Sequence, residues 1–225
     1  MGTTLIEPTR TRYRKSVKLP SELNNLLGLG VNNKKLGDII TKGRFKGYKI
    51  YQLSLEERAT CPRSCHHWLD CYGNNMPFAK RVDHTDPDFL GSLETELDRL
   101  VSTRGGRGVM VRLHVLGDFY SEDYVDFWWR MLDKHANLAV WGYTARKPAD
   151  PIGQVLAGMG AWFGGRCQIR ESNADLPTMS TVAIKTEAEC PPDAFVCPEQ
   201  TGKTKGCNTC GACWSTTKNV AFIDH

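Results

Sequence analysis

The sequence predicts an α/β protein built on a mostly parallel sheet, either an open sheet or a partial (β/α) barrel. Segments with strand character alternate with amphipathic helical segments between residues 48 and 185, which is the pattern of crossover-connected parallel strands. These roughly 140 residues are too few for a complete eight-stranded barrel. The composition, 40% hydrophobic and 24% charged over 225 residues, is that of an ordinary globular protein.

The first expected strand and the first expected helix flank a cysteine-containing segment. Residues 48–55 (YKIYQLSL) alternate and are rich in β-branched and aromatic side chains. A helix is expected from Asp86 to about Thr103, because an N-cap aspartate precedes a proline at the first helical position. Apolar residues then recur at helical spacing.

The second half of the body continues the alternation of strands and helices. The expected elements are a strand at 109–116, a helix capped by Ser121, a strand at 138–143, a short helix at 152–159, and strands at 167–170 and 181–185. We therefore expect three parts: a basic N-terminal arm over residues 1–47, the α/β body over residues 48–185, and a cysteine-rich module over residues 186–225.

The N-terminal part carries most of the positive charge. Residues 1–50 hold 11 basic and 3 acidic residues, a net charge of +8, whereas the whole chain carries +4. Such a segment either contacts phosphates or is a solvated surface arm. Residues 1–20 are polar and basic with no apolar core, and no apolar run reaches the length of a membrane span. A cytoplasmic protein without membrane contact is expected.

Nine cysteines in such a chain favour metal binding over disulfides, because the cytosol is reducing. Cys61, Cys65 and Cys71 form C-x3-C-x5-C directly after the first expected strand. Three thiolates are one short of a closed site, which is typical of a reactive centre that keeps a place for a non-protein ligand. His66 or His67 is the alternative fourth ligand.

A second cysteine set lies in the C-terminal module. Cys197, Cys207, Cys210 and Cys213 form C-x9-C-x2-C-x2-C, and the closely spaced run is typical of iron–sulfur proteins. A tetrahedral zinc site is the alternative. Cys190 is a possible substitute ligand. This set either holds a functional cluster, or it holds a cluster or zinc ion that only stabilises the fold of the C-terminal module.

Further polar residues follow the expected strands. The carboxyl ends of parallel strands meet at one edge of a sheet and carry the chemistry of most α/β enzymes. Gly117 and Asp118 follow one strand, and Thr144 and Arg146 follow the next. Arg170 ends a later strand. Arg112 and His114 alternate within an apolar strand, so we expect both to point to one face.

The C-x3-C-x5-C segment after the first strand resembles the radical S-adenosylmethionine (SAM) enzymes. Longer segments resemble a poorly characterised phage and bacterial gene-product family with radical SAM-like features, over roughly residues 45–215. These segments are LSLEERATCPRSCHHWLDCYGNNMPFAKR, VRLHVLGDFYSEDYVDFW and CPEQTGKTKGCNTCGACW. The resemblance implies a partial barrel in which Cys61, Cys65 and Cys71 hold a [4Fe–4S] cluster whose open iron binds SAM.

The resemblance also implies roles for single residues. Gly117 and Asp118 would meet the SAM amino group, and the C-terminal cysteines would hold an auxiliary [4Fe–4S] cluster. The expected catalytic residues are Asp118, His114 and Arg146, and the expected cofactor-binding residues are Gly117, Asp118, Tyr72, Thr144 and Arg170. The expected reductant is a flavodoxin or a ferredoxin.

The leading hypothesis is an enzyme that cleaves SAM reductively and starts radical chemistry on an unknown substrate, for which a nucleotide or nucleic acid is one candidate. The first alternative is a nucleic-acid-binding protein stapled by iron–sulfur or zinc sites, without SAM chemistry. The net charge of +8 on residues 1–50 and the cysteine-rich C-terminal module motivate this alternative. A small electron-transfer protein is a third hypothesis.

Overall fold

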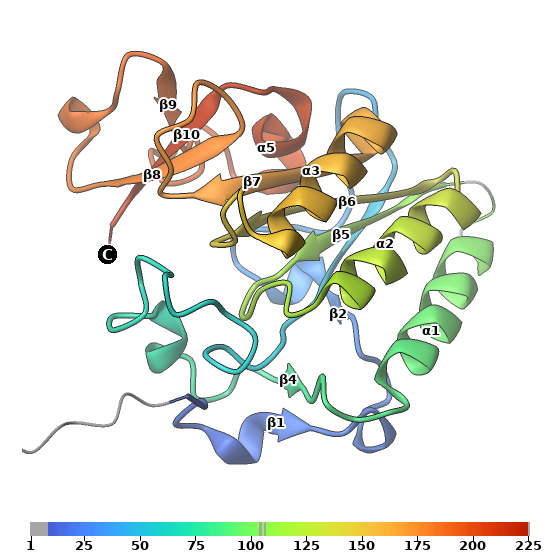
Figure 1. Ribbon diagram of the computed structural model, residues 1–225. Helices are drawn as coiled ribbons and strands as arrows, with labels where there is room; N and C mark the ends of the chain where they lie inside the picture. The colour runs from blue at the N-terminus through green and yellow to red at the C-terminus, as the bar shows by residue number, and fades with distance from the viewer. Residues whose placement is uncertain (1–8, 104, 106, 225) are drawn as a thin grey trace, which may run out of the picture.

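The computed structural model describes residues 9–103, 105 and 107–224, and its centre is a mostly parallel sheet (Figure 1). The strands of this sheet are β2 (Gly28–Leu29), β3 (Lys49–Gln52), β5 (Val109–Leu113), β6 (Leu138–Thr144), β7 (Cys167–Ser172), β8 (Ser180–Ile184), β9 (Ala194–Val196) and β10 (Asn219–Ile223). Their order is β2-β3-β5-β6-β7-β8-β10-β9, and only β2 runs antiparallel to its neighbour. The expected mixed α/β class is confirmed.

The three long helices lie along one face of this sheet. The α-helices are α1 (Phe89–Thr103), α2 (Glu122–Lys134), α3 (Pro151–Phe163), α4 (Cys207–Cys210) and α5 (Ala212–Ser215). The 3-10 helices are η1 (Arg14–Ser16), η2 (Pro20–Glu22), η3 (Gly30–Asn32), η4 (Tyr72–Asn75), η5 (Gly164–Arg166) and η6 (Glu187–Glu189). Figure 1 shows α1, α2 and α3 side by side. Because β3, β5, β6 and β7 follow each other in chain order, their crossovers return on the same side.

Local sequence explains where the helices begin. The Ser121 hydroxyl caps α2 by accepting a hydrogen bond from the Tyr124 amide at 3.2 Å, as expected. Helix α1 begins at Phe89, two residues after the predicted first helical position, Pro87. The reason is that the Asp86 carboxylate accepts a hydrogen bond from the Asp88 amide at 2.9 Å, which holds these residues in a turn before the helix.

Both faces of the sheet are buried, and the side chains of successive strand residues point alternately to one face and the other. Val111 and Val140 pack against α1 and α2 in one core. Met110 and Trp141 pack on the other face, with Leu36 from the N-terminal part. Trp214 from the C-terminal module completes this second core at 4.8 Å from the Trp141 ring. The two ends of the chain thus cover the face that the helices leave open.

The region expected to be a basic arm contributes buried side chains. Leu26 and Leu27 join the helix-side core, and Ile40 and Phe45 join the second core. A separate parallel pair joins β1 (Val17–Lys18) to β4 (Arg81–Val82). Residues 1–8 of the expected arm lie outside the described residues. The three-part division of the chain stays a prediction.

A buried ion pair lies within the segment that follows β3, and Thr11 and Ser16 of the N-terminal part are hydrogen-bonded to it. Arg81 Nε and Nη2 donate to the Glu57 carboxylate at 2.6 and 2.9 Å, and both side chains are almost fully buried. Arg81 also donates to the carbonyls of Gly73 and Ala79 at 3.2 and 2.7 Å. Thr11 donates to Glu57 at 2.7 Å. Burial by itself raises the pKa of Glu57, but these hydrogen bonds outweigh it and the net pKa lies below its usual value.

Within the described residues, no helix is both long and apolar enough to span a bilayer.

Replacing Arg81 with leucine should destabilise the protein strongly. Arg81→Leu leaves the Glu57 carboxylate buried without its partner, so we expect the free energy of unfolding to fall by about 3–5 kcal/mol. Urea unfolding followed by circular dichroism measures this loss. Lys18→Gln, which breaks an exposed ion pair with Glu22, is the control and should leave the midpoint nearly unchanged. Equal midpoints for the two variants would contradict the role of the buried pair.

Candidate functional site

The three cysteines of the first set share one loop after β3. Cys61, Cys65 and Cys71 are free, partly buried thiols between β3 and β4. Burial raises the pKa of Cys61, and the charges of Asp118 and of the other two thiolates raise it further. The three thiols therefore lie close enough to act on one another. The sequence predicted this shared location from their position after the first strand.

The same loop carries the other predicted side chains of this region. The rings of His66 and His67 stack edge to face, and His67 Nδ1 lies 3.3 Å from the Asp70 carboxylate. This pairing directs His67 toward an exposed carboxylate of its own loop. The Tyr72 hydroxyl donates to the carbonyl of Val115, which ties the cysteine loop to the end of β5.

Asp118 is the central acceptor at the carboxyl ends of the strands. Its Oδ1 accepts hydrogen bonds from the Phe119 amide and the Thr144 hydroxyl, both at 2.7 Å, and its Oδ2 accepts from the Ala145 amide at 2.7 Å. The Asp118 amide donates to Thr60 Oγ1 at 3.1 Å. Burial raises the pKa of Asp118 to about 6, although the hydrogen bonds oppose the rise.

Arg146 closes the same network from the end of β6. Its Nε donates to the Phe119 carbonyl and its Nη2 to the Thr60 carbonyl, both at 2.8 Å. Asp118, Thr144 and Arg146 thus meet next to the cysteine loop, as predicted from the parallel sheet. Protein donors already make three hydrogen bonds to the Asp118 carboxylate, which leaves it about one acceptor position for a ligand.

His114 lies elsewhere, and the expectation that it shares a face with Arg112 is wrong. His114 packs against the ring of Phe119 and its Nε2 lies 2.8 Å from the Tyr124 hydroxyl of α2, on the helix side. Arg112 instead lies over the Tyr143 ring at 4.4 Å, on the other face. The alternation ends at Leu113, the last residue of β5, so strand periodicity no longer applies to His114. Burial lowers the pKa of His114 to about 3, so its imidazole is neutral.

The second cysteine set packs against the face of the sheet that carries Tyr143. The Tyr143 hydroxyl donates to Cys213 Sγ at 3.1 Å. Cys207 and Cys213 border the Trp141 core. Burial raises the pKa of Cys207, and the charges of Cys213, Cys197 and Cys210 raise it further. The four predicted thiols are therefore close together.

Arg170 and Cys190 occupy different places around this set. Arg170 is fully buried and donates to the carbonyls of Cys213 and Lys218 at 3.3 and 2.7 Å, and to that of Thr216. The guanidinium group thus holds the C-terminal module on β7. The Cys190 thiol lies 3.6 Å from the carbonyl of Pro191. Arg170 was predicted to bind a cofactor, but in the structure it donates hydrogen bonds to main-chain carbonyls of this module.

The chemistry of both donor sets fits a thiolate-bound cluster, but neither set is in coordination geometry. Across residues 9–103, 105 and 107–224, no three Cys, His, Asp or Glu side chains stand close enough to hold a metal ion. Both sets consist of free thiols that lie near one another. Thiolate sites commonly close only when the metal binds, because ligation and ordering are coupled.

Arg112 and Tyr143 are polar residues of the site that were not among the predicted site residues. The charge of Arg112 partly offsets the rise in pKa that burial causes in Cys207 and Cys213. Arg112, which lies over the Tyr143 ring, is therefore near the second cysteine set. The available signal was a polar residue in the otherwise apolar run from Val109 to Leu113.

Replacing Gly117 with alanine tests the close contact between strand ends. Gly117 has φ +86°, and a Cβ there would lie 2.7 Å from Thr60 Oγ1 and 2.8 Å from Leu55 Cβ. The control is Gly43→Ala, because Gly43 has φ +72° and a Cβ there would meet no atom within 4 Å. This control should lower the free energy of unfolding by about 1 kcal/mol, the strain of a left-handed backbone conformation in a residue with a Cβ. Gly117→Ala should lower the free energy of unfolding by about 1–3 kcal/mol more than this control. Chemical denaturation measures both, and equal losses would contradict the contact.

Comparison with known proteins identifies a phage family. Residues 26–154, more than half of the chain, match the family described as Gene product 88. The chain is also 26% identical over 129 residues to the Gene 88 protein of Mycobacterium phage L5, covering 50% of this chain and 54% of that protein. The chain thus spans about half the length of this curated relative. No solved structure matches.

These findings correct the resemblance drawn from the cysteine motif. The matching family is a phage gene-product family and not a radical SAM family, so the assignment to radical SAM enzymes is wrong. The described residues also show no group arranged to bind a metal or a cluster. A C-x3-C-x5-C segment after a strand was too short a signal to assign a superfamily. The chain belongs to the Gene product 88 family.

Proposed function

We propose that this protein is an iron–sulfur enzyme in which Cys61, Cys65 and Cys71 hold an open [4Fe–4S] cluster that cleaves SAM reductively. The proposed substrate of the radical chemistry that follows is a nucleotide or a nucleic acid. One observation carries this proposal: the loop of the three free thiols is bound through Thr60, directly before Cys61, to the main chain of buried Asp118, at the carboxyl ends of β3, β5 and β6. This edge is where α/β enzymes carry their chemistry.

The donor set supports a cluster with one open iron. Three thiolates occupy three of the four irons of a [4Fe–4S] cluster, which leaves one iron for an exogenous ligand. When bound, the cluster supplies the electron for the cleavage of SAM. The reducing cytoplasm that we propose for this protein keeps such thiols free.

The residues of the chain hold the loop in place around this site. Thr60, directly before Cys61, is bound to Asp118 through its hydroxyl and to Arg146 through its carbonyl. Tyr72, directly after Cys71, is bound to the carbonyl of Val115. Both ends of the cysteine segment are thus fixed to strand ends, so the thiols keep their position against Asp118. We propose that the remaining acceptor position of Asp118 receives a substrate amino group.

The sheet supports a partial (β/α) barrel. Six parallel strands follow in chain order, and the three long helices lie together on one face. This singly wound arrangement differs from a doubly wound sheet, in which helices cover both faces. We propose that the second face, with Arg112 and Tyr143 near its carboxyl edge, is the interior of the partial barrel.

The surface of the cysteine loop supports docking of an electron donor. Phe78 is 97% exposed, and Leu69 and Tyr72 on the same loop are also exposed. Exposed apolar side chains that gather near one place favour a protein contact. We propose that a flavodoxin or a ferredoxin docks here.

The C-terminal cysteines support a second, auxiliary cluster. We propose that Cys197, Cys207, Cys210 and Cys213 are its ligands, because all four are free thiols, Cys207 and Cys213 pack against one core, and the short helix α4 joins Cys207 to Cys210. Arg112 and Arg170 lie near these thiols and offset the negative charge of four thiolates.

Metal analysis of matched cysteine variants tests this proposal. Protein purified without oxygen should contain about eight iron and eight sulfide per chain, the content of two [4Fe–4S] clusters. Cys65→Ala and Cys210→Ala should each lose about half of the iron, and Cys65→Ala should also lose 5′-deoxyadenosine production from SAM under reductant. Cys167→Ala removes a buried thiol of β7 outside both sets and should keep both properties.

Two results would contradict the proposed function. Undiminished 5′-deoxyadenosine production by Cys65→Ala would exclude the first cysteine set as its source. If the protein contains zinc in place of iron, at about one or two ions per chain, the better explanation is that it is a nucleic-acid-binding protein whose fold is stabilised by zinc.

The Tyr143 hydroxyl is expected to tune the auxiliary cluster. Tyr143→Phe removes the hydrogen bond to Cys213 Sγ, and the loss of a donor to a cluster sulfur should make the reduction potential more negative. Potentiometric titration followed by electron paramagnetic resonance measures this shift. Tyr48→Phe alters a tyrosine that packs against the same core and the Phe45 ring, and the potential of this variant should match that of the unmodified protein. An unshifted potential in Tyr143→Phe would rule out the tuning role.

A further inference from the structure

An arginine-lined cavity lies beside the cysteine loop. It has a volume of about 430 Å³, which is within the size range of small-ligand sites. Its lining includes Arg10, Arg12, Arg14, Arg58, Thr11 and Asn74. Asn74 connects the cavity to the cysteine loop, because its amide donates to the Cys71 carbonyl at 2.8 Å.

Arg58 is the buried arginine among the residues that line this cavity, and one of its nitrogens has no hydrogen-bond partner among the described residues. It is 8% exposed, and its Nη2 donates to Asn74 Oδ1 at 3.3 Å. Its Nη1 is buried with no acceptor among the residues that the structure describes. A buried guanidinium nitrogen without an acceptor is costly, and a ligand oxygen in the adjoining cavity would satisfy it. Arg58 also has φ +68°, a left-handed conformation that is uncommon for non-glycine residues.

The charges around the cavity are not balanced. Arg10 forms an ion pair with Glu56, with Nη2 and Oε2 2.6 Å apart. Arg12 and Arg14 are exposed and form no ion pair with another described residue. The cavity is therefore lined by three guanidinium groups, those of Arg12, Arg14 and Arg58, without a carboxylate partner.

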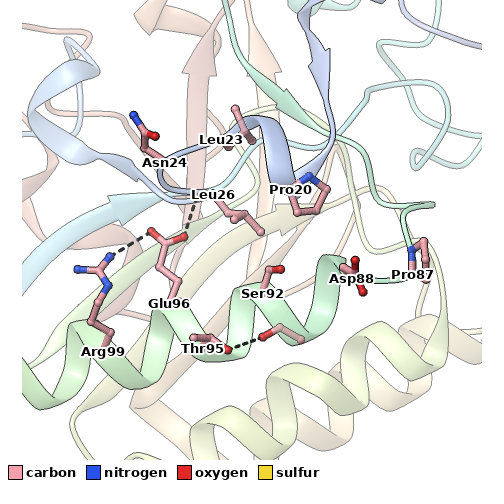
Figure 2. A pocket seen from close by; sticks show the side chains of 11 residues that line it. Pro20, Leu23, Asn24, Leu26, Pro87, Asp88, Ser92, Thr95, Glu96 and Arg99 are labelled. Carbon is pink, nitrogen blue, oxygen red and sulfur yellow. Dashed lines mark hydrogen bonds and ion pairs between the residues drawn. The ribbon is translucent and has the colours of Figure 1, made fainter.

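A larger cavity of about 640 Å³ shows what a balanced lining looks like. Figure 2 shows it between η2 and α1, with the Glu96 carboxylate directed at the main chain of Leu26. Glu96 accepts from the Leu26 amide at 2.6 Å and lies 4.0 Å from Arg99. Glu96 and Arg99 thus have partners within the protein and Asp88 is exposed, so among the lining residues of this cavity there is no buried charged group without a partner.

We infer that the arginine-lined cavity binds a phosphate group of a nucleotide or of a nucleic acid. The planar guanidinium fork matches phosphate oxygens with two parallel hydrogen bonds, which explains the preference for arginine at phosphate sites. Because the cavity adjoins the loop of Cys71, a phosphate bound there would anchor a substrate next to the first cysteine set. The substrate role rests on the proposed function, whereas phosphate binding itself does not require a cluster.

Calorimetric titration of the full chain, purified without oxygen, tests this site. Adenosine monophosphate and inorganic phosphate should bind, and adenosine should not. Arg58→Gln should weaken binding of adenosine monophosphate at least about tenfold, which is the loss of one charge-assisted hydrogen bond. The double variant Arg12→Gln, Arg14→Gln changes only exposed side chains and should weaken it as well, so the test survives if Arg58→Gln fails to fold.

Arg107→Gln is the matched control. It removes the same charge from an exposed position just before β5, at the opposite end of the strands, and should leave the affinity unchanged. A single-stranded oligodeoxynucleotide identifies the source of the phosphate. Tighter binding than the mononucleotide with a steep salt dependence indicates a nucleic-acid backbone, and equal affinity indicates a free nucleotide.

Two outcomes would overturn the inference: equal affinity for adenosine and its monophosphate, or equal loss in the double variant and in Arg107→Gln. Cys65→Ala separates this inference from the proposed function. Phosphate binding should persist in Cys65→Ala. If the unmodified protein binds phosphate but cleaves no SAM, the inferred phosphate site stands and the proposed function is wrong.

Discussion

The organisation of the site depends on one buried carboxylate, that of Asp118. It accepts hydrogen bonds from its own loop and from the end of β6, while its amide is bound to Thr60 in front of the cysteine loop. Three strand ends are thereby joined at a point that water does not reach. Because a buried acceptor of this kind is costly to leave unpaired, each of these segments constrains the others.

Buried arginines perform a related task for the segments that lack regular structure. The cysteine loop and the C-terminal module expose many carbonyls that no helix or sheet satisfies. Arg81 donates to carbonyls of the first segment, and Arg170 donates to carbonyls of the second. The guanidinium group suits this purpose, since it carries five donors in a fixed plane. Buried guanidinium groups thus help to position both cysteine sets.

The features predicted from the sequence are those with strong local signals. Three strands were predicted close to where the structure has β3, β5 and β6, at residues 48–55, 109–116 and 138–143. Apolar runs between turn residues can be recognised from the sequence alone. The start of α1 was misplaced, since an Asp86 side chain that caps a helix and one that closes a turn look the same in a sequence. The placement of His114 was missed because strand alternation ends at Leu113.

The sequence alone determined the α/β class, the grouping of the cysteines into two sets and the gathering of Asp118, Thr144 and Arg146 at the strand ends. All three follow from spacing along the chain and from the rule that parallel strands end at one edge. Only the tertiary structure decided that Arg112 and Tyr143 lie near the second cysteine set, and that Arg58 lines a cavity with arginines 44 to 48 residues earlier in the chain. Such contacts join segments that are distant in sequence, and packing rather than local preference brings them together.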